Sequence, residues 1–347
     1  MTDLSVCLAL AVIGGILNGS FASPTKYVKQ WKWENIWPVW AFVGMIVVPW
    51  ILVSATVPDP IGFYRAAPLR SLLMLFAFGV GFGSAQICFG LGLAAVGLAL
   101  GFAMMIGLTT VVGSLVPLVI LHPETILTAK GLTIIGGVGV MVVGIVLCAV
   151  AGGKKEKERE AAASGSAPAG SSPSGRSFKV GLVICFFGGA LGPLINFGLA
   201  FGTPLLKRAA ELGVGPASRS NVIWPPLQLA AFVPYIAYCV YLWRKNKTFH
   251  LFAAPGTAIN WLHGVVMGTL WMGSAAIYGA AAERMGAMGP ILGWPLFMSV
   301  IIITSNVWGF MTGEWKGVSR GPLTYMLGGI AFLILGFCIL AFAAKLG

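Results

Sequence analysis

The chain has 347 residues, of which 58% are hydrophobic and only 9% are charged, and its mean hydropathy is +0.90. Water-soluble domains of this length do not have such a balance, so the composition indicates a polytopic membrane protein. A net charge of +12 also suggests a nucleic-acid-binding protein. That class is excluded because nearly every Lys and Arg lies between apolar runs, and not on a basic face with stacking aromatic residues.

Ten apolar runs are long enough to cross about 30 Å of hydrocarbon as helices. They cover residues 4–22, 36–57, 69–93, 97–121, 129–151, 178–202, 220–243, 255–282, 288–311 and 321–344. Only Met1, Thr2 and Asp3 precede the first run, which therefore lacks the basic start of a cleaved signal peptide and is expected to remain as a membrane helix. The expected fold is all-α, with ten transmembrane helices.

The first loop lies within FASPTKYVKQWKWENIW, Phe21 to Trp37, and carries Lys26, Lys29 and Lys32 among tryptophans. Tryptophan prefers the headgroup region of a bilayer, and basic residues favour the cytoplasmic side. Most of the 22 Lys and Arg residues lie in or beside the loops that follow odd-numbered runs. This asymmetry predicts that both termini lie on the outer side of the membrane.

Residues 152–177 form the one low-complexity segment, a charge run followed by Ala, Ser, Gly and Pro. Such a composition buries little apolar area, so the segment is expected to be a disordered cytoplasmic linker. It separates five runs in residues 1–151 from five runs in residues 178–347. Because an odd number of helices reverses the direction of entry, two homologous halves would form inverted five-helix repeats.

Short matches between the halves support this repeat hypothesis because they occur in the same order. They pair Ser23-Pro24-Thr25-Lys26 with Thr203-Pro204-Leu205-Leu206-Lys207, Trp37-Pro38 with Trp224-Pro225, Val48-Pro49-Trp50 with Val233-Pro234-Tyr235, and Gly83-Ser84-Ala85 with Gly273-Ser274-Ala275. Inverted repeats with prolines inside corresponding helices are typical of alternating-access carriers, whose substrate site lies near the midplane.

The ten acidic residues all lie in loops or at the ends of runs. A catalytic carboxylate pair, a metal cluster or a Ser/His/Asp set at membrane depth would need acids that the runs do not contain. The six cysteines fall within apolar runs without CxxC spacing, so neither a disulfide framework nor a zinc site is indicated. We therefore expect no enzyme activity, no metal and no cofactor.

Neutral polar and aromatic side chains do occur at depth: Asn18, Gln86, Asn196, Gln228, His263, Trp271, Tyr278, Ser305 and Asn306. Amides donate to and accept from hydroxyl groups, and an aromatic face packs on the apolar face of a sugar ring. An anionic substrate would call for Lys or Arg at depth and a cationic one for a central Glu, so the pattern favours an uncharged, hydroxyl-rich solute. The alternative for each amide is hydrogen bonding between helices.

The residues predicted to bind substrate are Asn18, Gln86, Asn196, His263, Trp271 and Asn306. His263 is also a candidate proton carrier, because imidazole titrates near neutral pH, although it could bind substrate as a neutral group or be structural. Glu283 is a second protonation candidate. An ion pair with the adjacent Arg284 is its alternative role.

The chain resembles the bacterial L-rhamnose/proton symporters of the drug/metabolite transporter superfamily. The resemblance rests on the stretch Phe21 to Trp37, and continues through Val48-Pro49-Trp50, GVGFGSAQICFGLGLAAVGLALG, LGVGP, His263, Trp271 and Glu314-Trp315. It implies a ten-helix carrier that imports L-rhamnose with a proton across the bacterial inner membrane. In that membrane the termini, placed outside by the charge asymmetry, would be periplasmic.

Two other functions remain open at this point. One is a carrier or exporter of a related sugar or another neutral metabolite. The other is a membrane sensor that binds sugar without moving it, although such proteins usually carry a soluble signalling domain, and no loop here is longer than the linker. The expected partners are a neutral sugar, a proton and the lipid bilayer, with no nucleic acid and no obligate protein partner.

Overall fold

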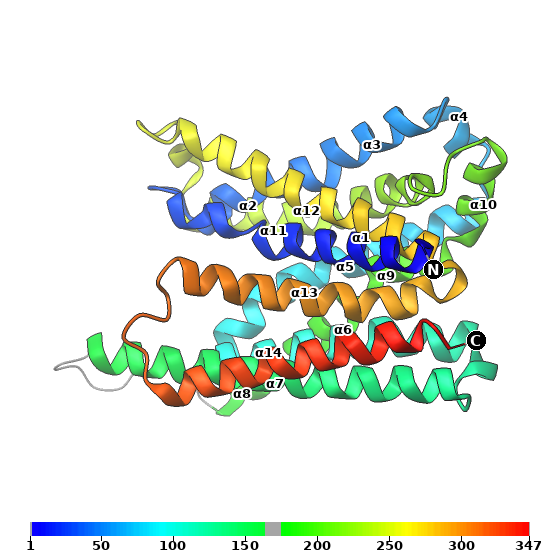
Figure 1. Ribbon diagram of the computed structural model, residues 1–347. Helices are drawn as coiled ribbons and strands as arrows, with labels where there is room; N and C mark the ends of the chain where they lie inside the picture. Colours follow the sequence, from blue (N-terminus) through cyan, green and yellow to red (C-terminus); the bar gives the residue numbers. More distant parts are fainter. Residues whose placement is uncertain (1, 164–174, 347) are drawn as a thin grey trace. The chain divides into compact units, whose positions relative to one another are not determined.

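The computed structural model describes residues 2–163 and 175–346, which are mostly helical (Figure 1). Ten helical segments in these ranges are long and apolar enough to cross a membrane. No strand occurs among the described residues. The expected all-α fold with ten membrane-spanning helices is confirmed.

The helices form two compact units that each take residues from both halves of the sequence. Unit 1 comprises Met1–Ser84 and Leu194–Gly293, and unit 2 comprises Ala85–Pro193 and Trp294–Gly347. The boundaries of these units therefore differ from those of the two predicted repeats, which cover residues 1–151 and 178–347.

Unit 1 contains most of the helices that carry the predicted site. They are α1 (Thr2–Ser20), η1 (Ser23–Tyr27), α2 (Trp33–Ala41), η2 (Phe42–Val47), α3 (Val48–Thr56), α4 (Pro60–Arg65), the first part of α5 (Leu69–Val96), α9 (Leu194–Phe201), α10 (Thr203–Glu211), η4 (Arg219–Val222), α11 (Trp224–Asn246), η5 (Phe249–Ala253), α12 (Ala258–Arg284), η6 (Gly286–Met288) and the start of α13 (Gly289–Met311).

The second membrane span is irregular at its centre, where the π-helical η2 joins α2 to α3. Pro49 follows this stretch, and a proline inside a helix removes a backbone donor and crowds the carbonyl group four residues earlier. Gly44 in η2 lies against α12, because a Cβ built there would be 2.9 Å from the Trp271 ring and 3.2 Å from the Gly268 carbonyl oxygen. The irregular turn thus brings the backbones of η2 and α12 into close contact.

The sixth run is a broken helix. Helix α8 (Gly175–Leu191) ends before Gly192 and Pro193, and α9 starts at Leu194. Proline cannot continue the hydrogen-bond pattern of a preceding helix, and glycine favours a helix end. The break places Asn196 in the first turn of α9, where backbone groups are available for other contacts.

Unit 2 contains the rest of α5, α6 (Leu98–Leu121), η3 (Pro123–Thr125), α7 (Ala129–Ala163), α8, most of α13 and α14 (Arg320–Ala343). Helices α7 and α14 lie side by side along much of their length (Figure 1). Their backbones touch at two glycines, since a Cβ on Gly144 would lie 2.9 Å from the Gly329 carbonyl oxygen. Such small-residue contacts are typical of helix pairs in membranes.

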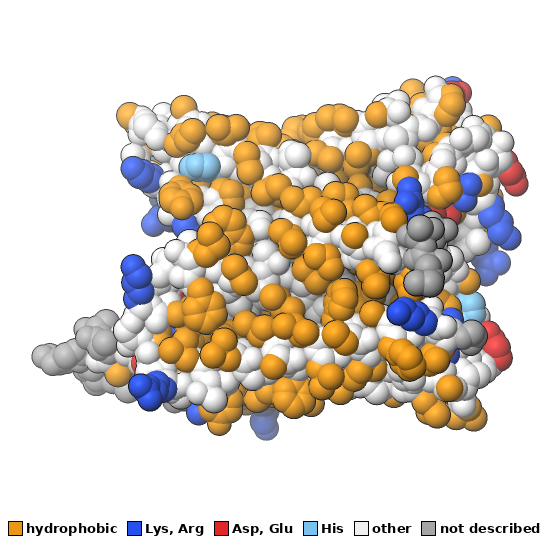
Figure 2. Space-filling model, viewed as in Figure 1, with side chains coloured by type: hydrophobic (Ala, Val, Ile, Leu, Met, Phe, Trp, Pro, Cys, Tyr) orange, Lys and Arg blue, Asp and Glu red, His pale blue; other side chains and the backbone are white. Residues whose placement is uncertain are grey.

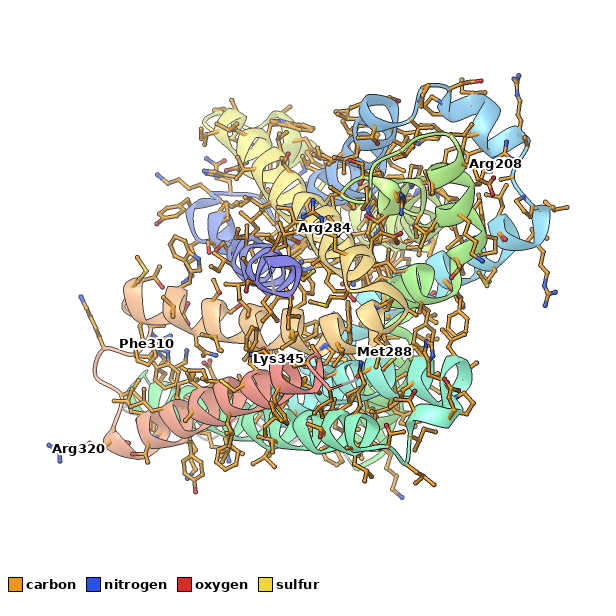
Figure 3. All side chains as sticks on the ribbon, turned by 45° about the vertical axis from the view of Figure 1, so that its right-hand side comes forward. Arg208, Arg284, Met288, Phe310, Arg320 and Lys345 are labelled. Atoms are coloured by element: carbon orange, nitrogen blue, oxygen red, sulfur yellow. The ribbon has the colours of Figure 1, made fainter. Side chains whose placement is uncertain are left out.

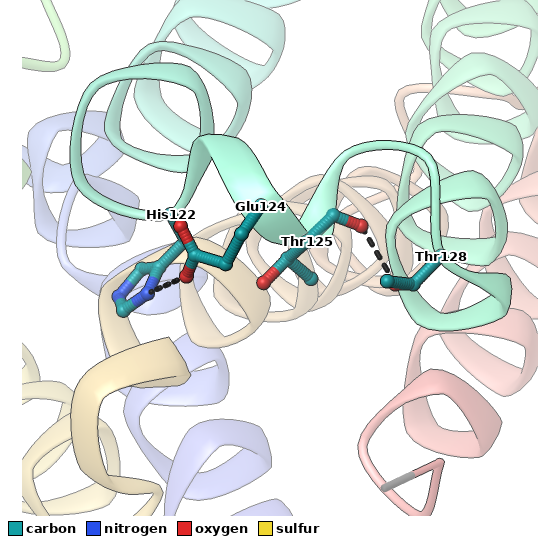
Figure 4. Close-up of polar contacts among 4 residues, drawn as sticks. All are labelled: His122, Glu124, Thr125 and Thr128. Carbon is teal, nitrogen blue, oxygen red and sulfur yellow. Dashed lines mark hydrogen bonds and ion pairs between the residues drawn. The ribbon is translucent and has the colours of Figure 1, made fainter.

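The connection from α6 to α7 is held by local polar contacts (Figure 4). His122 Nδ1 lies 3.3 Å from Glu124 Oε1, and the Thr128 hydroxyl donates to the Thr125 carbonyl oxygen at 2.6 Å. These contacts close the short turn at the start of α7.

The first part of the segment expected to be disordered is helical, because α7 continues to Ala163. Lys155 Nζ donates to Glu314 Oε2 at 3.0 Å, and the Ser319 backbone N–H donates to Glu158 Oε2 at 2.9 Å. The charge run is rich in Lys, Glu and Ala, which favour helices. Together with these tertiary contacts, this composition explains why the charge run extends α7. Residues 164–174 of the expected linker lie outside the described residues.

Many large apolar side chains are exposed on the outer faces of the long helices, among them Ile51, Val183 and Leu335. Figure 2 shows hydrophobic side chains along the helices and Lys and Arg gathered near helix ends. This distribution is the one that a bilayer selects, since lipid tails solvate apolar side chains and the headgroup region solvates charges.

Candidate substrate site

An aromatic cluster in unit 1 surrounds Trp271 of α12. The Phe82 ring is stacked on Trp271 with centroids 6.2 Å apart and planes 9° apart, and Trp40 meets Trp271 edge-on at 4.9 Å. Trp40 also contacts Tyr235 of α11 at 5.7 Å. Helices α2, α5, α11 and α12 therefore share one aromatic core.

Asn18 is joined to this cluster through Ser274. The Asn18 Nδ2 donates to Ser274 Oγ at 2.8 Å, and that hydroxyl donates to the Trp271 carbonyl oxygen at 2.5 Å. The structure thus brings together two of the predicted substrate residues, Asn18 and Trp271. Asn18 is half-buried, so its amide links α1 to α12 and remains partly accessible.

Asn196 has a different environment, because protein groups occupy both ends of its amide. The Tyr278 hydroxyl donates to Asn196 Oδ1 at 2.5 Å, and Asn196 Nδ2 donates to the Pro290 carbonyl oxygen at 3.0 Å. Asn196 and Tyr278 are both buried. These bonds tie the start of α9 to α12 and to the start of α13.

A pocket of about 310 Å³ lies beside this amide in unit 1, with Pro290 in its lining. Its polar lining groups are Thr203, Lys207, Arg219 and Glu283. Arg219 Nη1 lies 3.7 Å from Glu283 Oε1, and Arg219 Nε donates to the Val214 carbonyl oxygen at 3.0 Å. Figure 3 labels residues on three elements that frame the pocket: Arg208 on α10, Arg284 at the end of α12, and Met288 in η6.

The two predicted protonation sites lie near opposite ends of α12. A helix rises about 1.5 Å per residue, so His263 and Glu283 are about 30 Å apart along the axis and do not share a site. The His263 ring lies 6.4 Å from the Tyr27 ring, and its Nδ1 is buried without a hydrogen-bond partner among the described residues. Glu283 pairs with Arg219 in the pocket, and not with its neighbour Arg284 as the alternative supposed.

Gln86 and Asn306, the other predicted substrate residues, belong to unit 2. Gln86 is half-buried on α5. Asn306 Nδ2 donates to the Ile302 carbonyl oxygen of its own helix at 2.8 Å. Such a bond to the preceding turn satisfies the donor locally.

Gln228 of α11 is a buried polar residue that the predicted set omits. It is 0% exposed, and neither its Oε1 nor its Nε2 has a hydrogen-bond partner among the described residues. The same holds for the indole N–H groups of Trp40 and Trp224 and for the hydroxyl of Ser220. A buried polar group without a partner costs about 1 to 3 kcal/mol. The only sequence signal for Gln228 is an amide within an apolar run, which does not reveal whether that amide is paired.

Glu34, at the start of α2, is the one buried acidic side chain in the described part of the chain. Its Oε1 accepts hydrogen bonds from Asn246 Nδ2 and from the Thr248 hydroxyl, each at 2.9 Å. Its carbonyl oxygen accepts from the Trp243 indole N–H. This arrangement, which we call the Glu34 clasp, joins α2 to the end of α11.

The described part of the chain is all-helical, with ten membrane spans, a broken sixth helix and an uncharged polar and aromatic cluster between helices. These features define a multi-pass membrane protein of the secondary-carrier class. The family model described as L-rhamnose-proton symport protein (RhaT) matches residues 2–345. The chain belongs to this family.

Relatives include proteins named L-rhamnose-proton symporter from Cronobacter sakazakii, Shigella flexneri and Escherichia coli O1:K1 / APEC. Each is 26% identical to this chain, over 331 residues for the first and 332 residues for the other two. In all three comparisons the match covers 93% of both proteins. The predicted family is confirmed, and it is a family of transporters and not of enzymes.

Proposed function

We propose that this protein imports L-rhamnose together with a proton across the bacterial inner membrane. The observation that carries the proposal is the match of the L-rhamnose-proton symport protein family to residues 2–345. Relatives with that name cover nearly the whole chain. The uncharged polar and aromatic groups in unit 1 suit a neutral sugar.

Asn18 and Trp271 are the predicted substrate residues that we place first, because they lie in one linked cluster with the stacked Phe82 ring. The Trp271 indole offers an apolar face to a sugar ring, and the Asn18 amide offers a donor and an acceptor to hydroxyl groups. Asn196 acts as a brace beside the site, since its amide is bonded to Tyr278 and Pro290. Gln86, His263 and Asn306 remain predicted ligands.

We place the two protonation sites at different stages of transport. Glu283 lies in a pocket with Arg219 and would bind and release its proton there. The proton and the arginine would then compete for the Glu283 carboxylate. His263 lies near the other end of α12, and its Nδ1 has no hydrogen-bond partner in the described ranges. With the termini periplasmic, as the charge distribution predicts, Glu283 would receive the proton from the periplasm and His263 would be near the cytoplasmic end.

The inverted-repeat hypothesis fits the proposed role as a secondary carrier. Trp37-Pro38 and Val48-Pro49 lie in the span formed by α2, η2 and α3, while Trp224-Pro225 and Val233-Pro234 lie in α11. Both spans therefore carry a Trp-Pro pair followed by a Val-Pro pair, which supports corresponding roles in two repeats.

Uptake of labelled L-rhamnose into proteoliposomes, with and without an imposed pH gradient, tests the proposal. We expect accumulation when the outside is acidic and only equilibration when the gradient is collapsed. No uptake of L-rhamnose, with uptake of another neutral solute, would reject the substrate. Accumulation that ignores the gradient would reject proton coupling.

A further inference from the structure

The buried amide of Gln228 has an unusual environment for a residue that serves only stability. It is 0% exposed, and both of its polar atoms lack partners among the described residues. By contrast, Asn260 of α12 is equally buried, but its Nδ2 donates to the Lys29 carbonyl oxygen at 2.8 Å and its Oδ1 accepts from the Lys29 N–H. A structural amide is paired in this way, whereas an unpaired one lowers stability and needs another reason.

Two polar groups without a partner in the described ranges, on Ser220 in η4 and on Trp224 at the start of α11, lie close to Gln228 in the sequence. Trp224 is one turn earlier than Gln228 on the same face of α11, because residues four apart in a helix are neighbours. A Cβ built on Gly279 would lie 2.5 Å from Ser220 Oγ and 3.0 Å from the Trp224 ring, so those two residues meet α12 at the same place. The Trp224 indole N–H and the Ser220 hydroxyl both lack partners among the described residues.

Gln228 also lies near the aromatic cluster. Along the axis of α11 it is about 6 Å from Trp224 and about 10 Å from Tyr235. Tyr235 contacts Trp40, whose indole N–H lacks a partner in the described ranges, and Trp40 contacts Trp271. Along α11, Gln228 therefore lies between Trp224 and Tyr235. Trp224 and the Trp40 ring that contacts Tyr235 each have an indole N–H without a partner among the described residues.

These groups have a chemistry that fits a polyhydroxylated, uncharged ligand. An indole N–H only donates, whereas a glutamine amide and a serine hydroxyl both donate and accept. Sugar hydroxyls also donate and accept, so neighbouring hydroxyls of one ring can pair with both ends of an amide. None of the four groups carries a charge that would select an ion.

We infer that Gln228 is a ligand of the sugar hydroxyls and a specificity-determining residue of the carrier, with the indole N–H groups of Trp40 and Trp224 as additional donors. This inference rests on the proposed function and adds ligands to the Asn18 and Trp271 cluster. Trp40, Trp224 and Gln228 are at most 2% exposed, so the sugar reaches them when the carrier opens, as alternating access requires. Binding of a hydroxylated ligand supplies the missing partners, while an analogue without the matching hydroxyl leaves them unpaired and is rejected.

The test compares Gln228→Leu with Asn260→Leu in purified, detergent-solubilised protein and in proteoliposomes. Thermal unfolding is followed with and without L-rhamnose, and the KM of L-rhamnose uptake is measured. For Gln228→Leu we expect an unfolding temperature without sugar at least equal to that of the wild type, no stabilisation by L-rhamnose, and a KM raised at least tenfold. For Asn260→Leu we expect a lower unfolding temperature, a normal stabilisation by L-rhamnose and little change in KM.

A Gln228→Leu protein that unfolds earlier, as Asn260→Leu does, and keeps both the stabilisation by sugar and the wild-type KM would overturn the inference. If Gln228→Leu does not fold, Gln228→Asn decides, since it keeps the amide but withdraws it by one methylene group. A raised KM in that variant supports the inference, and an unchanged KM overturns it. A wild-type protein that neither binds nor transports L-rhamnose would instead reject the proposed function.

Discussion

The Tyr278 hydroxyl donates a hydrogen bond to Asn196 Oδ1 at 2.5 Å, although α10 and α11 separate the two residues in the sequence. Both side chains are buried. Because Asn196 Nδ2 also donates to the Pro290 carbonyl oxygen, one amide fixes α9 against α12 and α13. The pocket that contains Glu283 and Arg219 shares Pro290 with this brace.

Tyr278→Phe removes the hydroxyl from this bond and keeps the ring. We expect a loss of about 1 to 2 kcal/mol in the free energy of unfolding, because a buried acceptor loses a donor. Thermal unfolding in detergent measures the change. Tyr241→Phe is the matched control, since that side chain is more than half exposed, and it should unfold like the wild type. Equal stability of the two variants would contradict the role of the brace.

The ten membrane spans could be predicted from the sequence because they depend on length and hydropathy alone. Two local features could not. The π-helical turn before Pro49 and the break at Pro193 depend on how the backbone relaxes around a proline, which can kink, loosen or end a helix. The charge run after Gly152 was expected to be disordered, but its contacts with Glu314 and Ser319 continue α7 to Ala163.

For the candidate site, the sequence could predict which types of residue take part but not which groups they contact. An amide in an apolar run indicates a polar contact, but its partner is set by tertiary structure. Asn196 and Asn306 have protein partners, whereas Gln228 has none among the described residues. The sequence also suggested Arg284 as the ion-pair partner of Glu283, whereas tertiary structure pairs Glu283 with Arg219.

Gly44→Ala tests the close contact between η2 and α12. The added methyl group would lie 2.9 Å from the Trp271 ring and 3.2 Å from the Gly268 carbonyl oxygen, so the helices must move apart. We expect a lower unfolding temperature and weaker L-rhamnose binding, because Trp271 shifts. Gly90→Ala is the control: a Cβ at that position in α5 has no atom within 4 Å, and alanine stabilises a helix relative to glycine by about 0.5 to 1 kcal/mol. A Gly44→Ala protein as stable as Gly90→Ala would show that the contact is not tight.

Glu34→Ala tests the Glu34 clasp. The substitution leaves the Asn246 amide and the buried Thr248 hydroxyl without their shared acceptor, so we expect a loss of about 2 to 3 kcal/mol in the free energy of unfolding. Glu156→Ala, at an exposed position of α7, should leave stability unchanged. A thermal unfolding curve for Glu34→Ala that matches the control would mean that the clasp contributes nothing to stability.

Glu283→Gln removes the charge that pairs with Arg219 and cannot carry a proton. We expect the variant to exchange labelled for unlabelled L-rhamnose but to lose accumulation driven by a pH gradient. Glu211→Gln, an exposed substitution at the end of α10, should accumulate sugar normally. Accumulation by Glu283→Gln at the wild-type level would remove Glu283 from the proton path.

His263→Gln applies the same test near the other end of α12. The variant keeps a hydrogen-bonding side chain of similar size but cannot titrate, so we expect normal folding and a weakened dependence of uptake on pH. The exposed His250 provides the control His250→Gln. If the pH profile of His263→Gln follows that of the wild type, His263 is not a proton carrier.

The central claim is that the movement of L-rhamnose is coupled to the movement of a proton. It is tested most directly by adding L-rhamnose to weakly buffered, de-energised right-side-out vesicles that contain the protein and recording the external pH. The account predicts an immediate alkalinisation of the medium that requires L-rhamnose and is abolished by a protonophore. L-rhamnose uptake by the same vesicles without any change in external pH would contradict it.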